Sequence, residues 1–262
     1  MIDIAYESFV DNICDNIAME SDDSEDNIIV RFFKKIAELW TKFINFIREK
    51  AKAISTAIKR FFGKDEASSN SESEGNSENK EQSEDTSHSN TNASAKDGKY
   101  YVTNAKMFAI GIDIMHILDW TMTSVLNCMN VADKNMCYDK MNEINKIVKD
   151  PTPVMSERGK AIAKHGYSMY GVTSKDMKIM SNTVIAAYTR AKSNTNKINA
   201  VCNKVIGGRF SKKPNNETIT ALNRLNTTAA QALTQLVNSA QSAVNNLRSV
   251  SKEEYEKAVK VE

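Results

Sequence analysis

The sequence contains few of the residues that interrupt helices. Its 262 residues include only 9 Gly and 3 Pro. Tight turns and strand connections rely on Gly and Pro, whereas the interiors of long helices exclude both. The composition therefore predicts an all-α chain. Aromatic residues are also sparse, at 7%, and the 12 Met residues indicate an adaptable core.

Catalytic and metal-binding motifs are missing as well. The sequence has no GxxxxGK[ST], GxGxxG, HExxH or GxSxG pattern. Its four cysteines, Cys14, Cys128, Cys137 and Cys202, form no CxxC pair, and their spacing fits neither a disulfide scaffold nor a zinc site. We expect them to be reduced thiols, as in cytosolic proteins. We interpret the chain as a non-enzyme, with no catalytic residue, cofactor, metal or small-molecule substrate.

Three weaker constellations have a structural and a chemical interpretation. Asp113, His116 and Asp119 are spaced by three residues, so they share one helix face and could ligate a metal or form a polar stripe. We favour the polar stripe. The Gly207–Arg209 segment resembles a phosphate loop, but no strand precedes it, so we interpret it as a turn between helices. His165 and Cys202 could pair as base and nucleophile, although nothing in the sequence brings them together.

Long uncharged apolar runs are also absent. The best candidate for a membrane span, residues 105–122, is interrupted by Lys106, Asp113, His116 and Asp119. A membrane span needs about 18 or more apolar residues in a row, so we expect no transmembrane helix. The first turn carries Asp3 and Glu7 where a signal peptide would be basic, so we expect no signal peptide either.

Charge is distributed in alternating blocks, although the net charge is only +2. Residues 1–27 carry nine acids and no Lys or Arg, and residues 28–62 carry nine bases and two acids. Residues 63–97 are again acidic, with nine acids and three bases, and residues 98–262 carry 23 bases and 13 acids. Such asymmetry favours electrostatic partners.

The N-terminal part predicts two amphipathic helices. Residues 1–26 contain a short acidic one, and residues 27–63 a long basic one, since apolar residues recur at intervals of three and four. Residues 64–97 contain no aromatic residue and no Val, Ile or Leu. Because such a segment cannot bury enough apolar surface to offset its ordering entropy, we predict a disordered acidic linker and a domain boundary there.

Residues 98–262 predict a C-terminal helical bundle. A helix over 103–149, broken near 131–135, and a short helix over 156–165 precede two long helices. Those two helices carry apolar seams with alternating steps of three and four, the pattern of a coiled coil. The seams are Met177, Met180, Val184, Ala187, Ala191, Asn194, Ile198, Val201, Val205 and Ala229, Leu233, Leu236, Ala240, Ala243, Leu247, Val250. The short turn over 207–214 predicts a long antiparallel coiled-coil hairpin, with helix 103–149 as a third layer.

The basic helix is the most suggestive functional element. Its bases and those of the turn at 207–214 are candidate polyanion-binding residues: Arg31, Lys34, Lys35, Lys42, Lys50, Lys52, Lys59, Arg60, Arg209, Lys212 and Lys213. One interpretation is nonspecific DNA binding by phosphate neutralisation. Another is anchoring on an anionic membrane surface through the apolar face. A third is an ordinary helix that packs on its neighbours and solvates its charges.

The opening residues 5–9 and 17–21 resemble the N-termini of virion proteins from large tailed bacteriophages. In that group, internal head proteins often carry an acidic propeptide, which a prohead protease removes after Glu. Ala18-Met19-Glu20 fits such a processing site, and Ser21 would become the new N-terminus. The resemblance covers residues 1–27 and implies an internal head protein. It implies a location in the virion or the host cytoplasm.

We therefore expect a non-enzymatic structural or interaction protein, a virion component that acts by helical packing and nonspecific polyanion contact. The expected partners are other virion proteins or further copies of the chain, with DNA as a nonspecific ligand. The alternative is a membrane-surface-binding protein anchored by helix 28–62.

Overall fold

The computed structural model describes residues 25–62, 100–164, 169–209 and 214–259. The protein is mostly helical, which confirms the predicted all-α class. The long helices are α2 (Glu25–Phe62), α3 (Ala105–Val131), α4 (Lys134–Lys149), α6 (Ser174–Ile206) and α7 (Asn216–Asn245). The shorter elements are β1 (Tyr100–Asn104), η2 (Thr152–Val154), α5 (Glu157–Ala163), β2 (Met169–Val172), β3 (Arg248–Val250) and α8 (Lys252–Val259).

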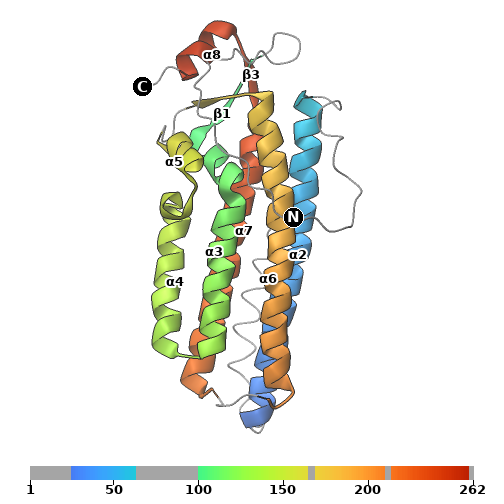
Figure 1. Cartoon of the computed structure of the whole chain (residues 1–262), viewed down its shortest axis with the longest axis vertical. Coiled ribbons are helices and arrows are strands. Elements are labelled where there is room, and N and C mark those ends of the chain that lie inside the picture. The colour runs from blue at the N-terminus through green and yellow to red at the C-terminus, as the bar shows by residue number, and fades with distance from the viewer. Residues whose placement is uncertain (1–24, 63–99, 165–168, 210–213, 260–262) are drawn as a thin grey trace, which may run out of the picture.

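Four of these helices, α2, α3, α6 and α7, form a bundle around one apolar core (Figure 1). Helix α6 packs against α3 and α2, and α7 packs against α3 and α2. The side chains of all four helices meet around a small apolar cavity of about 10 Å³. A space of this size and polarity gives water no hydrogen-bond partner. The core is therefore continuous from one corner of the bundle to the other.

The predicted coiled-coil hairpin is wrong about which helices pair. Helices α6 and α7 run antiparallel, but they lie at opposite corners of the bundle, with α2 and α3 between them. Their seam residues are buried as expected, from Met177 to Val205 on α6 and from Ala229 to Ala243 on α7; Leu247 is also buried but lies beyond the end of α7. Val250 lies outside the helix, in β3. A seam shows that one side of a helix is buried, and it leaves the identity of the partner open.

Helix α2 belongs to this same core. Phe33, Trp40 and Phe43 are fully buried, and most of the apolar face predicted from the sequence is buried with them. Only Phe61 of that face is exposed, at 37%. Residues 25–62 and the helices of residues 98–262 therefore form one folded unit, instead of a separate basic helix and a separate C-terminal domain. The predicted linker over 64–97 and the segment 1–24 lie outside the described residues.

The predicted break in helix 103–149 is confirmed. Ala132 adopts the left-handed conformation, with φ 53°, and ends α3. The Asp133 side chain then accepts a hydrogen bond from the backbone N–H of Met136 and caps α4. Helix α4 therefore turns back, and it packs on the outer side of α7.

A small antiparallel sheet, in the order β2-β1-β3, lies at one end of the bundle and was not predicted (Figure 1). Strand β1 pairs with β2 from Tyr101↔Val172 and with β3 from Tyr100↔Val250. The Thr103 hydroxyl donates a 2.6 Å hydrogen bond to the carbonyl of Ala243, which ties the sheet to α7. Strands of three to five residues are too short to show an alternating pattern in the sequence.

Candidate functional site

The basic residues of α2 lie along its outward side. Arg31, Lys34, Lys42, Lys52, Lys59 and Arg60 are exposed, whereas Lys35 and Lys50 are partly buried. The Lys50 ammonium also lies over the Phe46 ring, 5.2 Å from its centroid. The predicted set is therefore brought together on one helix, and Arg48, which the prediction omitted, is exposed among them.

Helix α6 adds six further bases that the sequence analysis missed. All six are exposed: Lys175, Lys178, Arg190, Lys192, Lys197 and Lys204. The one acid of this helix, Asp176, is buried and paired with Arg158. The signal in the sequence is the excess of six bases over one acid within residues 174–206. Helices α2 and α6 are neighbours, and we call their exposed Lys and Arg residues together the α2–α6 basic face. Helix α2 also exposes two acids, Glu38 and Glu49.

Several lysines outside this face form ion pairs with nearby acids. On the other helices, Lys134 pairs with Glu217, Lys140 with Glu143 and Lys257 with Glu253. On α6, Arg190 contacts Asp119 at 3.4 Å. The lysines of α6, and Lys34, Lys52 and Lys59 of α2, make no ion pair with the residues that the structure describes. These eight lysines therefore present positive charge to solvent without an ion-pair partner in the described part of the chain.

Arg209 lies at the end of the bundle where α2 begins, because α6 runs antiparallel to α2 (Figure 1). It is exposed and extends the basic face at that end. Lys212 and Lys213 lie outside the described residues. The same holds for the predicted processing site at Ala18, Met19, Glu20 and Ser21.

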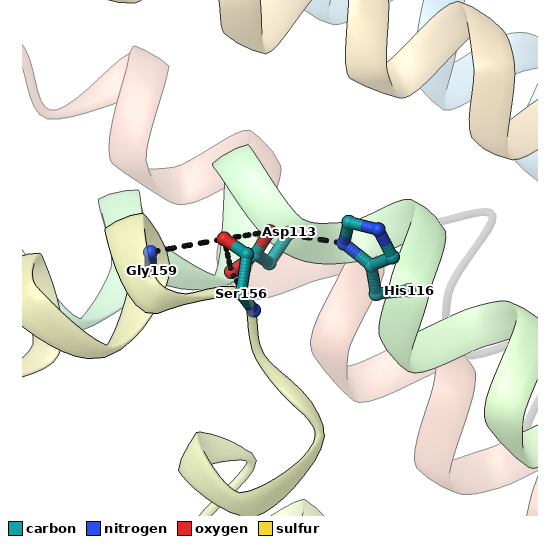
Figure 2. A network of polar contacts seen from close by, with 4 residues as sticks. All are labelled: Asp113, His116, Ser156 and Gly159. Carbon is teal, nitrogen blue, oxygen red and sulfur yellow. Dashed lines mark hydrogen bonds and ion pairs between the residues drawn. The ribbon is translucent and has the colours of Figure 1, made fainter. Parts of the chain in front are cut away.

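Figure 2 shows a second polar cluster, where the buried carboxylate of Asp113 lies between Ser156 and His116. The Ser156 hydroxyl lies 2.8 Å from Asp113 Oδ2, and the Ser156 backbone N–H donates to the same oxygen at 2.9 Å. His116 Nδ1 lies 3.2 Å from Asp113 Oδ1. Gly159 N–H donates to the Ser156 hydroxyl, so Ser156 caps α5.

This cluster contains Ser, His and Asp, but its order does not suit nucleophilic catalysis. A catalytic histidine must lie between the serine and the carboxylate, so that it can take the hydroxyl proton. Here the carboxylate lies between the other two, and the serine hydroxyl is already engaged with it and with Gly159. A Cβ at Gly159 would lie 1.8 Å from Asp113 Oδ2, so the glycine permits this close approach. The cluster fastens the start of α5 to α3.

The alternative metal site is not formed at this position. Asp119 turns to other partners, since Asn194 donates to it at 2.9 Å. Among the residues that the structure describes, no three His, Cys, Asp or Glu side chains gather in a way that could hold a metal ion.

The apolar faces of α3 and α2, which could contact a membrane, are buried in the core of the bundle. One described helix, α3, is long and apolar enough to cross a bilayer, and 67% of its most apolar window is buried in the bundle. That burial is what a core helix shows. The apolar face of α2 is likewise buried, so an interfacial anchor would require α2 to leave the bundle.

No known protein family, curated protein or solved structure matches this chain. The functional argument therefore depends on the charge and geometry of the basic face.

Proposed function

We propose that the protein is a non-enzymatic structural protein that binds nucleic acid nonspecifically through the α2–α6 basic face. The observation that carries this proposal is the concentration of exposed bases on two neighbouring helices, among them eight lysines with no ion pair to a described residue. Nonspecific nucleic-acid binding is driven by such charges, because each Lys or Arg that meets a phosphate releases a condensed counterion.

The dimensions of the face suit a duplex. Helix α6 has 33 residues, which correspond to roughly 50 Å at about 1.5 Å per residue. Double-stranded DNA carries one phosphate per strand every ~3.4 Å, so a face of this length spans roughly 15 base pairs. The bases lie on regular helices, and no loop that could enter a groove interrupts them. We therefore expect contacts to phosphate without base readout.

The proposal includes a virion setting, which rests on the N-terminal resemblance alone. An internal head protein packed against DNA benefits from positive charge. Cleavage after Glu20 would remove Asp3, Glu7, Asp11, Asp15 and Glu20 and would raise the net charge from +2 to +7. We expect a chain that begins at Ser21 to bind DNA more tightly than the full chain at low salt. An intact segment 1–20 in the native particle, measured by mass spectrometry, would count against the processing step.

Charge removal on the face tests DNA binding directly. In the test variant, Lys34, Lys52, Lys59, Lys178, Lys192 and Lys197 are all replaced by Gln. Fluorescence anisotropy with a 30-base-pair duplex would be measured at several salt concentrations. We expect the affinity at low salt to fall at least tenfold. The slope of log affinity against log salt should decrease by about 0.9 for each lost phosphate contact.

The matched control removes the same number of lysines from α4 and α8. It replaces Lys134, Lys140, Lys146, Lys149, Lys252 and Lys257 by Gln, and it has the same net charge as the test variant. We expect the control to bind within about twofold of the unchanged protein, since exposed ion pairs contribute little to stability. Equal losses in both variants would show that net charge alone acts. An absence of DNA binding by the unchanged protein at low salt would contradict the proposal.

A further inference from the structure

Two cysteines meet at the corner between α3 and α4. Cys128 lies in the last turn of α3 and Cys137 in the first turn of α4, and both side chains are fully buried. The Cys128 Sγ lies 3.8 Å from the carbonyl oxygen of Met136, the residue directly before Cys137. The two side chains lie close enough that each shifts the pKa of the other. The left-handed Ala132 and the Asp133 cap fix the two helices at this corner.

We propose that Cys128 and Cys137 form a conditional disulfide, which closes when the protein meets a small-molecule disulfide such as oxidised glutathione. The inference is independent of nucleic-acid binding. The two cysteines are nine residues apart in the sequence, and the helix break at Ala132 brings them to the same corner.

The exchange proceeds in two balanced steps. The Cys128 thiolate attacks one sulfur of the small disulfide, so that a mixed disulfide forms and one small thiolate leaves. The Cys137 thiol then loses its proton, and its sulfur attacks Cys128 Sγ and releases the second small thiol. The protein loses two electrons and two protons in total, and the small disulfide becomes two thiols.

The surroundings of the two thiols favour this order of attack. The contact with Cys137 lowers the pKa of Cys128, and the same contact raises the pKa of Cys137. The thiolate is the nucleophile, so Cys128 is the attacking residue. The corner residues 130, 131 and 133–135 are exposed, and helix ends open locally more easily than helix centres. A small disulfide therefore reaches Cys128 without global unfolding.

Cys202 provides an internal comparison. It is also fully buried and lies near the end of α6. Burial raises the pKa of its thiol to about 12. It forms no disulfide with another cysteine of the described ranges. We expect Cys202 to stay reduced under conditions that oxidise the Cys128–Cys137 pair.

Peptide mapping provides the test. The full chain would be incubated with oxidised glutathione, alkylated, and digested with trypsin, which cuts after Lys134 between the two cysteines. We expect peptide 107–134 to be joined to peptide 135–140 by a disulfide, while peptide 198–204 carries the alkyl group on Cys202. The oxidised protein should also melt several degrees higher than the reduced protein, because the cross-link constrains the unfolded chain.

The Cys137→Ser variant is the control for the pair, and Cys202→Ser is the control for the loss of any buried thiol. Oxidised glutathione should raise the melting temperature of Cys202→Ser. In Cys137→Ser the exchange should stop at the mixed disulfide on Cys128, and the melting temperature should not rise. Alkylation of both Cys128 and Cys137 after prolonged incubation would overturn the proposal. So would a disulfide that joins either of them to another cysteine.

Discussion

Buried polar side chains join helices that are distant in the sequence. The Trp40 indole N–H donates a 2.7 Å hydrogen bond to Asn226 Oδ1, which links α2 to α7. The Asn226 amide in turn donates to the carbonyl of Leu222. Similarly, Asn194 of α6 donates to Asp119 of α3. A buried donor without an acceptor costs about 1–3 kcal/mol. An arrangement in which other helices were neighbours would leave these donors unpaired and would therefore be less stable.

Replacing Asn226 by Leu should therefore destabilise the bundle. The substitution leaves the Trp40 N–H buried without an acceptor, and we expect a loss of about 1–3 kcal/mol in the free energy of unfolding. Chemical denaturation followed by circular dichroism measures it. The control is Asn203→Leu at an exposed position of α6, which should change stability by less than about 0.5 kcal/mol.

The double variant Trp40→Phe with Asn226→Leu separates the hydrogen bond from packing. It removes donor and acceptor together, so it should be more stable than the sum of the two single losses implies. Strict additivity of the two losses would show that the bond contributes nothing specific.

At the level of the helix, each seam packs on two neighbours at once. Val184 and Ala187 of α6 line the central cavity together with Ile54 of α2 and Leu118 of α3. The next residue after Val184, Ile185, points outward and is 52% exposed. Adjacent positions of one helix thus differ sharply in burial, which offers a matched pair of substitutions.

Val184→Asp should destabilise the bundle by about 3–5 kcal/mol, because it buries a carboxylate without a partner. The small cavity beside it has no room for a solvating water and no polar lining. Ile185→Asp introduces the same charge one position away, and it should leave the melting temperature nearly unchanged. Comparable melting temperatures for the two variants would contradict the placement of the α6 seam.

In the whole molecule, α2 is the one helix of the four-helix bundle that does not come from residues 98–262. It packs against both α6 and α7, and its buried aromatic residues fill the side of the core that those helices leave open. Residues 98–262 alone would expose that side, so the helices of this range are not expected to be independently stable.

Cutting the chain between α2 and β1 tests this dependence. A site for a specific protease would be inserted within residues 63–99, and the cut protein would be passed over a size-exclusion column. We expect the two pieces to elute together in buffer and to separate in denaturant, because the apolar face of α2 remains docked. A C-terminal piece that elutes alone as a folded monomer would show that α2 is a separate unit.

The sequence by itself determined the helical class, the approximate bounds of the long described helices and the buried side of α2, α6 and α7. Sparse Gly and Pro, the seam over 177–205 and the break near 131–135 could be predicted, because these effects are local to a helix. The basic side of α2 could also be predicted, since charge excluded from the apolar face must lie outside the core.

Only the tertiary structure decided which helices are neighbours. The seams of α6 and α7 looked alike and adjacent, yet contacts with α2 and α3 separate them, because a seam is complementary to any apolar partner. The same arrangement brings α6 beside α2, places Cys128 and Cys137 at one corner, and assembles the short sheet from three distant segments. These features depend on how helices pack in space, and a local pattern of residues carries no information about that.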